Sequence, residues 1–357
     1  MTKHFNYFLI FLLLPFIAIS LFLVNEISHK LFIKELIYIF IGIIAFFVTY
    51  LLPIRKLLWI IPFIYLFNLI LLGLVDIVGI KILGAQRWLK IPILNITIQP
   101  SEFMKTTLLL MLGYSIYKYP PRPVYTFKEF IKLSLIIVIP FLLIAKEPDL
   151  GTALITLTIG FGVLFIIGVD KKVWISLGIF AIFFMPVAYK FLLKDYQKKR
   201  IENFLNKPSY HVKQSIIAIG SGGLYGKSKD EATQTQLKFL PIASSDFIFA
   251  YLVERFGFIG AGSLITLYFI LIYYLFSIAK KLKEDYFAKV MFSGVALMIF
   301  IYSYINISMT MNLAPVVGVP LPLVSHGGTS FINFMILFGI LENLISKKEF
   351  INTYGVK

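Results

Sequence analysis

Long apolar stretches, separated by shorter polar segments, set the pattern of the chain. A stretch of about 17 to 25 apolar residues is long enough to cross a bilayer as a helix, and about ten such stretches recur here. They lie near residues 5–24, 32–51, 57–78, 100–117, 130–146, 151–168, 173–191, 246–279, 286–311 and 328–345. The pattern predicts an all-α polytopic membrane protein with about ten transmembrane helices in a single membrane domain over residues 1–357.

Composition supports the membrane assignment. Of the 357 residues, 59% are hydrophobic, and the mean hydropathy of +0.87 is far above that of soluble globular domains. The first apolar run continues past Ala18-Ile19-Ser20, which weakly resembles a signal-cleavage site, so we expect an uncleaved first span.

The distribution of positive charge predicts the topology. The 34 lysines and arginines exceed the 18 acidic residues, and the net charge is +16. These cations stand in short blocks between apolar runs rather than along one face, which argues against a nucleic-acid partner. Because cytoplasmic loops carry an excess of Lys and Arg, the blocks predict that both termini are cytoplasmic. The blocks expected inside are Arg55 and Lys56, then Lys118, Arg122 and Lys128, then Lys171 and Lys172, then Lys280, Lys281 and Lys283, and the tail residues Lys347 and Lys348.

The longest polar segment, residues 192–245, is expected to be a large extracytoplasmic loop between the seventh and eighth spans. Its cations from Lys194 to Lys213 depart from the charge rule, but long loops can cross the membrane regardless of charge. They fit either anionic lipid head groups or a substrate. Shorter outward segments are expected at 25–31, 79–99, 147–150 and 312–327.

Asp246 stands where this polar segment gives way to the eighth span. A carboxylate at the mouth of a membrane helix is costly to desolvate, which favours a functional role. A helix cap is the other interpretation, since Ser244 and Ser245 are good N-cap residues and an acid suits the first turn. Asp246 alone does not decide between them.

The other unusual polar residues also fall on the predicted outward side. Glu102 and Lys105 are spaced to share one face at the start of the fourth span, where they either orient a helix end or face an aqueous cavity. Arg87 precedes them, beside Trp88. Asp149 lies in a tight re-entry that fits ordinary helix-start chemistry.

Several other chemistries find no support in the sequence. The chain has no cysteine, and its four histidines, His4, His29, His211 and His326, show no metal-site spacing, so no metal or other cofactor is predicted. A dependence on divalent cations stays open. The segment Gly220-Ser221-Gly222-Gly223 lacks the spacing of a phosphate-binding loop. Residues 306–330 are too rich in proline and glycine for a regular span, so we place them against a cavity.

Six motifs together resemble one family. GAQRW at 84–88, QPSEFMK at 99–105, EPDLGTA at 147–153, YHVKQSIIAIGSGGLYGK at 210–227, SDFIFA at 245–250 and PVVGVPLPLVSHGGTS at 315–330 follow the order and spacing of the SEDS family of peptidoglycan glycosyltransferases. The resemblance covers nearly the whole chain. Its IAIGSGGL and PVVGVPLPLVS segments resemble the RodA type, which acts in elongation, more than the FtsW type, which acts in division.

The resemblance implies an activity and a set of roles. The family joins lipid II units, transferring glycan from an undecaprenyl pyrophosphate donor to the 4-hydroxyl of an acceptor, outside the bacterial inner membrane. Asp246 matches the family's proposed catalytic aspartate, and Arg87, Glu102, Lys105 and Asp149 match polar residues of its cavity. A class B penicillin-binding protein, acting as transpeptidase within an elongation complex, is the implied partner.

The sequence also departs from the family pattern close to Asp246. Ile242 and Ser244 stand where many relatives carry a glutamate and a histidine, Val253 replaces another acid, and His326 replaces a tyrosine. Any mechanism that needs those missing groups is in doubt, whereas Asp246 is retained.

Glycosyl transfer from a sugar pyrophosphate needs a base for the acceptor hydroxyl and positive charge for the departing pyrophosphate. We therefore assign Asp246 as the base and Arg87, Lys105 and Lys213 as substrate-binding cations. Glu102 holds Lys105 in this hypothesis. A single displacement at the anomeric carbon would invert its configuration. The further substrate-binding candidates are Asp149 and Ser325.

Two other functions are compatible with intramembrane charge. A lipid II flippase would move the substrate without forming a bond, but a transport route needs polar groups across its depth, whereas the acids here gather at one membrane face. The chain also shows no internal repeat of the kind that many transporters contain. A scaffold that only recruits an enzyme would not need buried charges.

Overall fold

The computed structural model describes residues 5–82, 85–91, 96–147, 149–206, 208–232, 234, 239 and 243–346. Gly84, Ile242, Lys347 and Lys348, which the sequence singled out, lie outside these ranges.

Each expected span is a helix, with bounds close to those expected from the apolar runs. The span helices are α1 (Tyr7–Ile27), α2 (His29–Leu51), α3 (Ile61–Val78), α4 (Pro100–Lys118), α5 (Phe127–Lys146), α6 (Leu150–Ile167), α7 (Lys171–Val187), α11 (Ile248–Lys281), α12 (Tyr286–Thr310) and α13 (Gly328–Ile345). The short helical turns η1 (Ile54–Lys56) and η2 (Leu58–Ile60) precede α3, and the π-helical turn η3 (Ala188–Leu192) follows α7.

Eight of the described helices are long and apolar enough to cross a membrane. α4 and α5, with 19 and 20 residues, are long enough as well but carry charged side chains, including Glu102 and Lys105 in α4. Both pack among the membrane helices, α4 against α3 and α12, and α5 against α6. The chain is an integral membrane protein with a mostly helical fold, as the sequence predicts.

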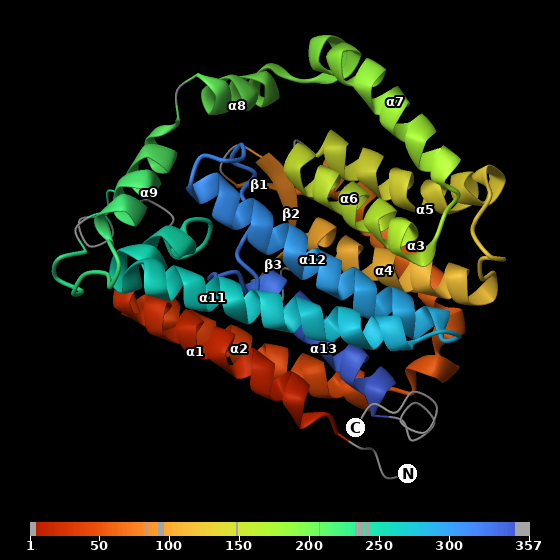
Figure 1. Cartoon of the computed structure of the whole chain (residues 1–357), viewed down its shortest axis with the longest axis horizontal. Coiled ribbons are helices and arrows are strands. Elements are labelled where there is room, and N and C mark those ends of the chain that lie inside the picture. Colours follow the sequence, from red (N-terminus) through yellow and green to blue (C-terminus); the bar gives the residue numbers. More distant parts are fainter. Residues whose placement is uncertain are drawn as a thin grey trace.

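The helices form one bundle around a shared apolar core (Figure 1). α13 packs on α2, α11 packs on α12, and α12 also contacts α4 and α6, so that α12 and α13 are the most buried spans. The start of α1 meets the end of α13, where the Asn6 amide donates to Glu342. At the other end, Arg255 in α11 pairs with Glu26 in α1.

The segment between α3 and α4 departs from the expected all-α fold. It forms a three-stranded antiparallel sheet of β1 (Ile80–Ile82), β2 (Ala85–Ile91) and β3 (Ile96–Ile98), in the order β1-β2-β3. Its alternating isoleucines and polar residues suit short strands, whose side chains point to opposite faces in turn. The sequence analysis expected a short outward segment at 79–99 and did not identify the strands.

The described part of the segment between η3 and α11 includes the helices α8 (Asp195–Leu205) and α9 (Tyr210–Ser221). Figure 1 shows α7 at the edge of the bundle and α8 leading from it to α9, which packs against α11. Val173 is the buried residue of α7, so this helix contributes little to the core. Placement of the segment outside the membrane stays a prediction.

The glycine-rich stretch after α9 supplies hydrogen-bond acceptors at the point where α11 is interrupted. Gly257 has a left-handed φ of 62°, which interrupts the helix. The N–H groups of Phe258 and Ile259 therefore donate to the carbonyls of Gly223 and Leu224. The stretch has a structural task, in agreement with the missing phosphate-loop spacing.

Candidate active site

Asp246 lies in a turn just before α11 rather than within its first turn. The N-cap of α11 is Phe247, and no side chain of the described residues caps the helix. The cap interpretation of Asp246, Ser244 and Ser245 is therefore wrong. What holds Asp246 instead is Asn306 of α12, whose amide donates to the Asp246 carbonyl at 3.0 Å and to the Val319 carbonyl at 2.7 Å.

The Asp246 carboxyl is half-buried, next to the backbone of the 312–327 segment. A Cβ atom added to Gly318 would lie 3.5 Å from its Oδ2, so the carboxyl meets bare backbone there. Burial raises the pKa of the Asp246 carboxyl, and a hydrogen bond from Ser245 lowers it in part. A raised pKa makes a carboxylate a stronger base, which suits proton abstraction from a sugar hydroxyl.

A buried ion pair occupies the start of α4. Lys105 Nζ lies 2.5 Å from Glu102 Oε1 and also donates to the hydroxyl of Tyr302 in α12. Lys105 is 1% exposed and Glu102 is 8% exposed. The second Glu102 oxygen is buried and has no hydrogen-bond partner among the described residues. The pair therefore sits in the protein interior, as two charges on a membrane helix require.

α12 brings the ion pair and Asp246 to the same region. Tyr302, which contacts Lys105, and Asn306, which holds Asp246, are four residues apart and share one helix face. Four residues correspond to about 6 Å along the axis, so both anchor points fall within about one turn of α12. The two strongest sequence candidates, far apart in the chain, thus converge on one face.

A second polar cluster joins β2 to the start of α6. Arg87 Nη1 lies 3.5 Å from Oδ2 of Asp149, which also accepts from Gln99 at 3.4 Å. Asp149 is the N-cap of α6, since its Oδ1 accepts from the Thr152 amide at 3.3 Å. The helix-start interpretation of Asp149 is therefore confirmed, and the same carboxylate also orients the Arg87 guanidinium.

Glu147, beside this cluster, was not singled out in the sequence analysis. It is 1% exposed, and neither carboxyl oxygen has a hydrogen-bond partner among the described residues. Burial, with smaller contributions from Asp149 and Asp76, raises its pKa to about 8, against a smaller lowering by Arg87. A glutamate between an apolar span and the next helix was the available signal.

Ser325 and Lys213 lie apart from these clusters. The Ser325 hydroxyl is buried, donates to the Ser245 carbonyl at 2.5 Å and accepts from the Leu321 amide at 2.8 Å. These bonds give it a positioning role, and substrate binding by Ser325 stays a prediction. Lys213 is exposed on α9, and among the described contacts none joins its side chain to Asp246 or to the ion pair.

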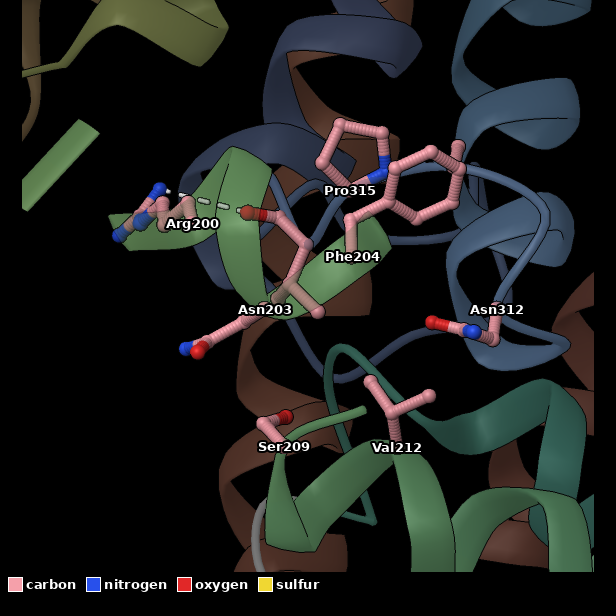
Figure 2. Close-up of a pocket in the computed structure, with 9 residues that line it drawn as sticks. Arg200, Asn203, Phe204, Ser209, Val212, Asn312 and Pro315 are labelled. Atoms are coloured by element: carbon pink, nitrogen blue, oxygen red, sulfur yellow. Dashed lines mark hydrogen bonds between the residues drawn. The ribbon is translucent and has the colours of Figure 1, made fainter. Parts of the chain in front are cut away.

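The basic stretch around α8 borders a small cavity next to the 312–316 segment (Figure 2). The cavity has a volume of about 190 Å³ and lies between α8, α9 and the residues after α12. Arg200 donates to the Val316 carbonyl at 3.3 Å, shown as a dashed line in Figure 2. Val316 in turn packs against the apolar cluster that contains Phe247, the neighbour of Asp246.

Val253 and His326, two of the departures from the family pattern, lie in different surroundings. Val253 is buried in the apolar core, so the position where many relatives carry an acid is apolar in this chain. His326 pairs with Glu35 of α2, a buried acid that the sequence analysis also missed. The signal for Glu35 was that it is the one acid in the 32–51 run, next to Lys34.

Comparison with known proteins yields a family and close relatives. A family model described as cell cycle protein, covering FtsW, RodA and SpoVE, matches residues 2–349. The chain is 52% identical over 346 residues to the peptidoglycan glycosyltransferase MrdB of Helicobacter pylori, covering 96% of this chain and 90% of the relative. It is 39% identical over 300 residues to the peptidoglycan glycosyltransferase MrdB of Escherichia coli K12, covering 82% and 79%.

Two solved structures share the fold. A chain of a peptidoglycan synthase complex, described as coordinating polymerization and crosslinking, superposes with a TM-score of 0.81 at 28% identity, covering 97% of this chain and 99% of that one. Thermus thermophilus rod shape determining protein RodA superposes with a TM-score of 0.72 at 24% identity, covering 96% of each chain.

Proposed function

The chain belongs to the FtsW/RodA/SpoVE family of cell cycle proteins, and we propose that it polymerises peptidoglycan strands from lipid II during cell-wall elongation. The chain aligns with peptidoglycan glycosyltransferases at 52% and 39% identity over most of its own length and of theirs, and it is a peptidoglycan glycosyltransferase too. In the proposed reaction, glycan is transferred from an undecaprenyl-pyrophosphate-linked donor to the 4-hydroxyl of an acceptor lipid II.

One observation carries the proposal at the level of residues. The backbone carbonyl of Asp246 and the ammonium of Lys105 meet the same face of α12, where Asn306 and Tyr302 bond them, so the Asp246 carboxyl belongs to a residue anchored about one turn from the ion pair. A base and a cation within reach of one substrate are what transfer from a sugar pyrophosphate needs. The α4 pair thus has a use beyond orienting a helix end.

In the proposed mechanism the Asp246 carboxylate accepts the proton of the acceptor 4-hydroxyl as the oxygen attacks the anomeric carbon of the donor. The bond from that carbon to the pyrophosphate breaks, and the electron pair leaves on the pyrophosphate oxygen. One displacement inverts the anomeric configuration. Lys105, oriented by Glu102, and Arg87, oriented by Asp149, stabilise the negative charge that develops on the leaving group.

The partner, the cellular location and the roles of Lys213 and the α8 cations are further proposals. The solved relative in a peptidoglycan synthase complex supports a class B penicillin-binding protein as the transpeptidase partner. The basic blocks at the predicted inner ends support placement in the bacterial inner membrane with cytoplasmic termini and an outward active site. Lys213 and the α8 cations fit either anionic lipid head groups or the substrate pyrophosphate.

The absence of a resident metal or other cofactor also stays a proposal. Among the described residues, no three His, Asp or Glu side chains gather as metal ligands. Any need for a divalent cation would be measured by comparing the polymerisation rate in EDTA and in added Mg²⁺.

The lipid II flippase remains the second candidate function, and one experiment separates the two. The purified protein, with its transpeptidase partner, is given fluorescent lipid II in detergent, where no bilayer exists to be crossed. Polymerase activity yields long glycan strands that a β-1,4-specific muramidase digests, in accord with inversion. No strands from the wild-type complex, together with lipid II movement in proteoliposomes, would favour the flippase instead.

A further inference from the structure

A buried acid–histidine pair next to Asp246 has no task in the mechanism above. Glu35 is the first buried residue of α2, at the start of the helix face that packs into the protein, and is 0% exposed. Its Oε2 lies 2.5 Å from Nδ1 of His326, and its Oε1 accepts from the Ser20 hydroxyl of α1 at 3.5 Å. Isolated buried carboxylates are costly in a membrane protein, so such residues pair and mark functional positions.

His326 is also joined through its backbone to the turn that carries Asp246. Three successive carbonyls of that turn accept hydrogen bonds from the 312–327 segment and from α12. The Ser244 carbonyl accepts from the His326 amide at 2.8 Å, the Ser245 carbonyl from the Ser325 hydroxyl at 2.5 Å, and the Asp246 carbonyl from Asn306 at 3.0 Å. The turn is therefore fastened residue by residue to the 312–327 segment and α12.

Of these three residues, His326 has a side chain whose hydrogen-bond partner lies on α2. Its imidazole reaches α2, and the ring centroid lies 6.0 Å from that of Tyr38, also in α2. α2 in turn packs extensively on α13, which begins two residues after His326. The side chain thus connects the turn of Asp246 to the α2–α13 pair, the largest helix contact in the bundle.

We propose that the Glu35–His326 pair is a positioning device that fixes the turn 244–246 and so holds the Asp246 carboxyl at its working position. The inference rests on the proposed function for its catalytic part. Neither residue touches the reacting atoms, since the pair acts through the His326 amide. It also accounts for a histidine at a position where the family resemblance implies a tyrosine.

Hydrogen exchange tests the mechanical part without relying on catalysis. The full-length protein in detergent, as wild type, Glu35→Gln and His326→Gln, is compared at peptides covering 243–247. We expect exchange to rise several-fold in both variants, because the amide of residue 326, which donates to the Ser244 carbonyl, is no longer held in place by the side-chain pair and the turn opens more often. The matched control is Asp285→Asn, which breaks the ion pair with Arg55 at the opposite end of α12 and should leave these peptides unchanged. Unchanged exchange in the Glu35 and His326 variants would overturn the proposal.

Kinetics test the catalytic part. A misplacement of about 1 Å can cost about 100-fold in rate, so we expect kcat for lipid II polymerisation to fall about 10- to 100-fold in each single variant while KM stays within about twofold. The double variant Glu35→Gln/His326→Gln should be no worse than either single one, since the two act as a unit. A loss of kcat in the Asp285→Asn control of the same size would reduce the pair to a structural role.

Glu35→Asp covers the case in which the neutral variants do not fold. It keeps the carboxyl group but shortens the side chain by one methylene, which moves the carboxyl away from His326 without changing its chemical type. Wild-type exchange and kcat in this variant would again overturn the proposal. A wild-type complex that forms no strands would instead refute the proposed function, while the exchange result would still decide whether the pair fastens the turn.

Discussion

Replacing Lys105 with methionine separates the structural and chemical roles of the α4 ion pair. Methionine keeps most of the length of the lysine side chain but removes the ammonium. Because Lys105 is 1% exposed and its Nζ is 2.5 Å from Glu102, the variant leaves a carboxylate in the interior without its counter-ion. The second Glu102 oxygen already has no partner among the described residues, so little can compensate. Breaking one side of a buried pair costs about 3–5 kcal/mol.

The matched variant Glu102→Gln/Lys105→Met removes both charges. Exchange of a buried pair for neutral groups is often close to neutral, so we expect most of the lost stability to return. Stability would be measured by denaturant unfolding in detergent, followed through tryptophan fluorescence. Activity should not return, because the double variant still lacks the cation that stabilises the leaving pyrophosphate.

Two results would refute this reasoning. Polymerisation at the wild-type rate by the double variant would show that the pair only orients the helix. A Lys105→Met protein as stable as wild type would show that Glu102 is not as buried as the structure indicates.

The remaining predictions concern the second polar cluster. Arg87→Lys should slow polymerisation about tenfold or more, because an ammonium cannot reproduce the planar fork that a guanidinium offers to phosphate oxygens; an unchanged rate with lipid II would remove Arg87 from the leaving-group site. Glu147→Gln should change the pH dependence of stability. The pKa of Glu147 is raised to about 8, so the folded state binds this proton more tightly than the unfolded state does. Its contribution therefore falls as pH rises between about 4.5 and 8, by about 1.4 kcal/mol per pH unit. Melting curves should show the variant gaining on the wild type across that range, and a constant difference would contradict the assigned environment.

Hydropathy predicted the helices because a membrane leaves the backbone few choices. Each long apolar run must satisfy its own N–H and C=O groups, and a helix does so locally. The same rule explains why the span expected to begin at residue 246 is a helix that begins at Ile248. The sheet of 80–98 was not predicted because its strands are short and lie between spans, where hydropathy does not distinguish a strand from a loop.

The site was predictable where charge stands out against apolar sequence and not where it depends on long-range pairing. Asp246, Glu102 and Lys105 could be identified one at a time. Their convergence on α12 could not, since Lys105 and Tyr302 are 197 residues apart. The Glu35–His326 pair could not be predicted for the same reason, since its residues are 291 apart in the sequence.

Two substrate-binding candidates illustrate the limit of residue type as evidence. The Ser325 hydroxyl is bonded to two backbone groups, and Lys213 points to no partner among the described contacts. A serine or lysine in a family motif can stabilise the fold or bind substrate, and the residues that it contacts show which role it has.

The most direct measurement of the central claim compares wild type with Asp246→Asn in the polymerisation of fluorescent lipid II by the partner-bound protein. Asparagine keeps the shape of the side chain and the backbone bond to Asn306 but cannot accept the hydroxyl proton. We expect a folded, partner-bound variant that forms no glycan strands. Strands formed at the wild-type rate would contradict the assignment of Asp246 as the base.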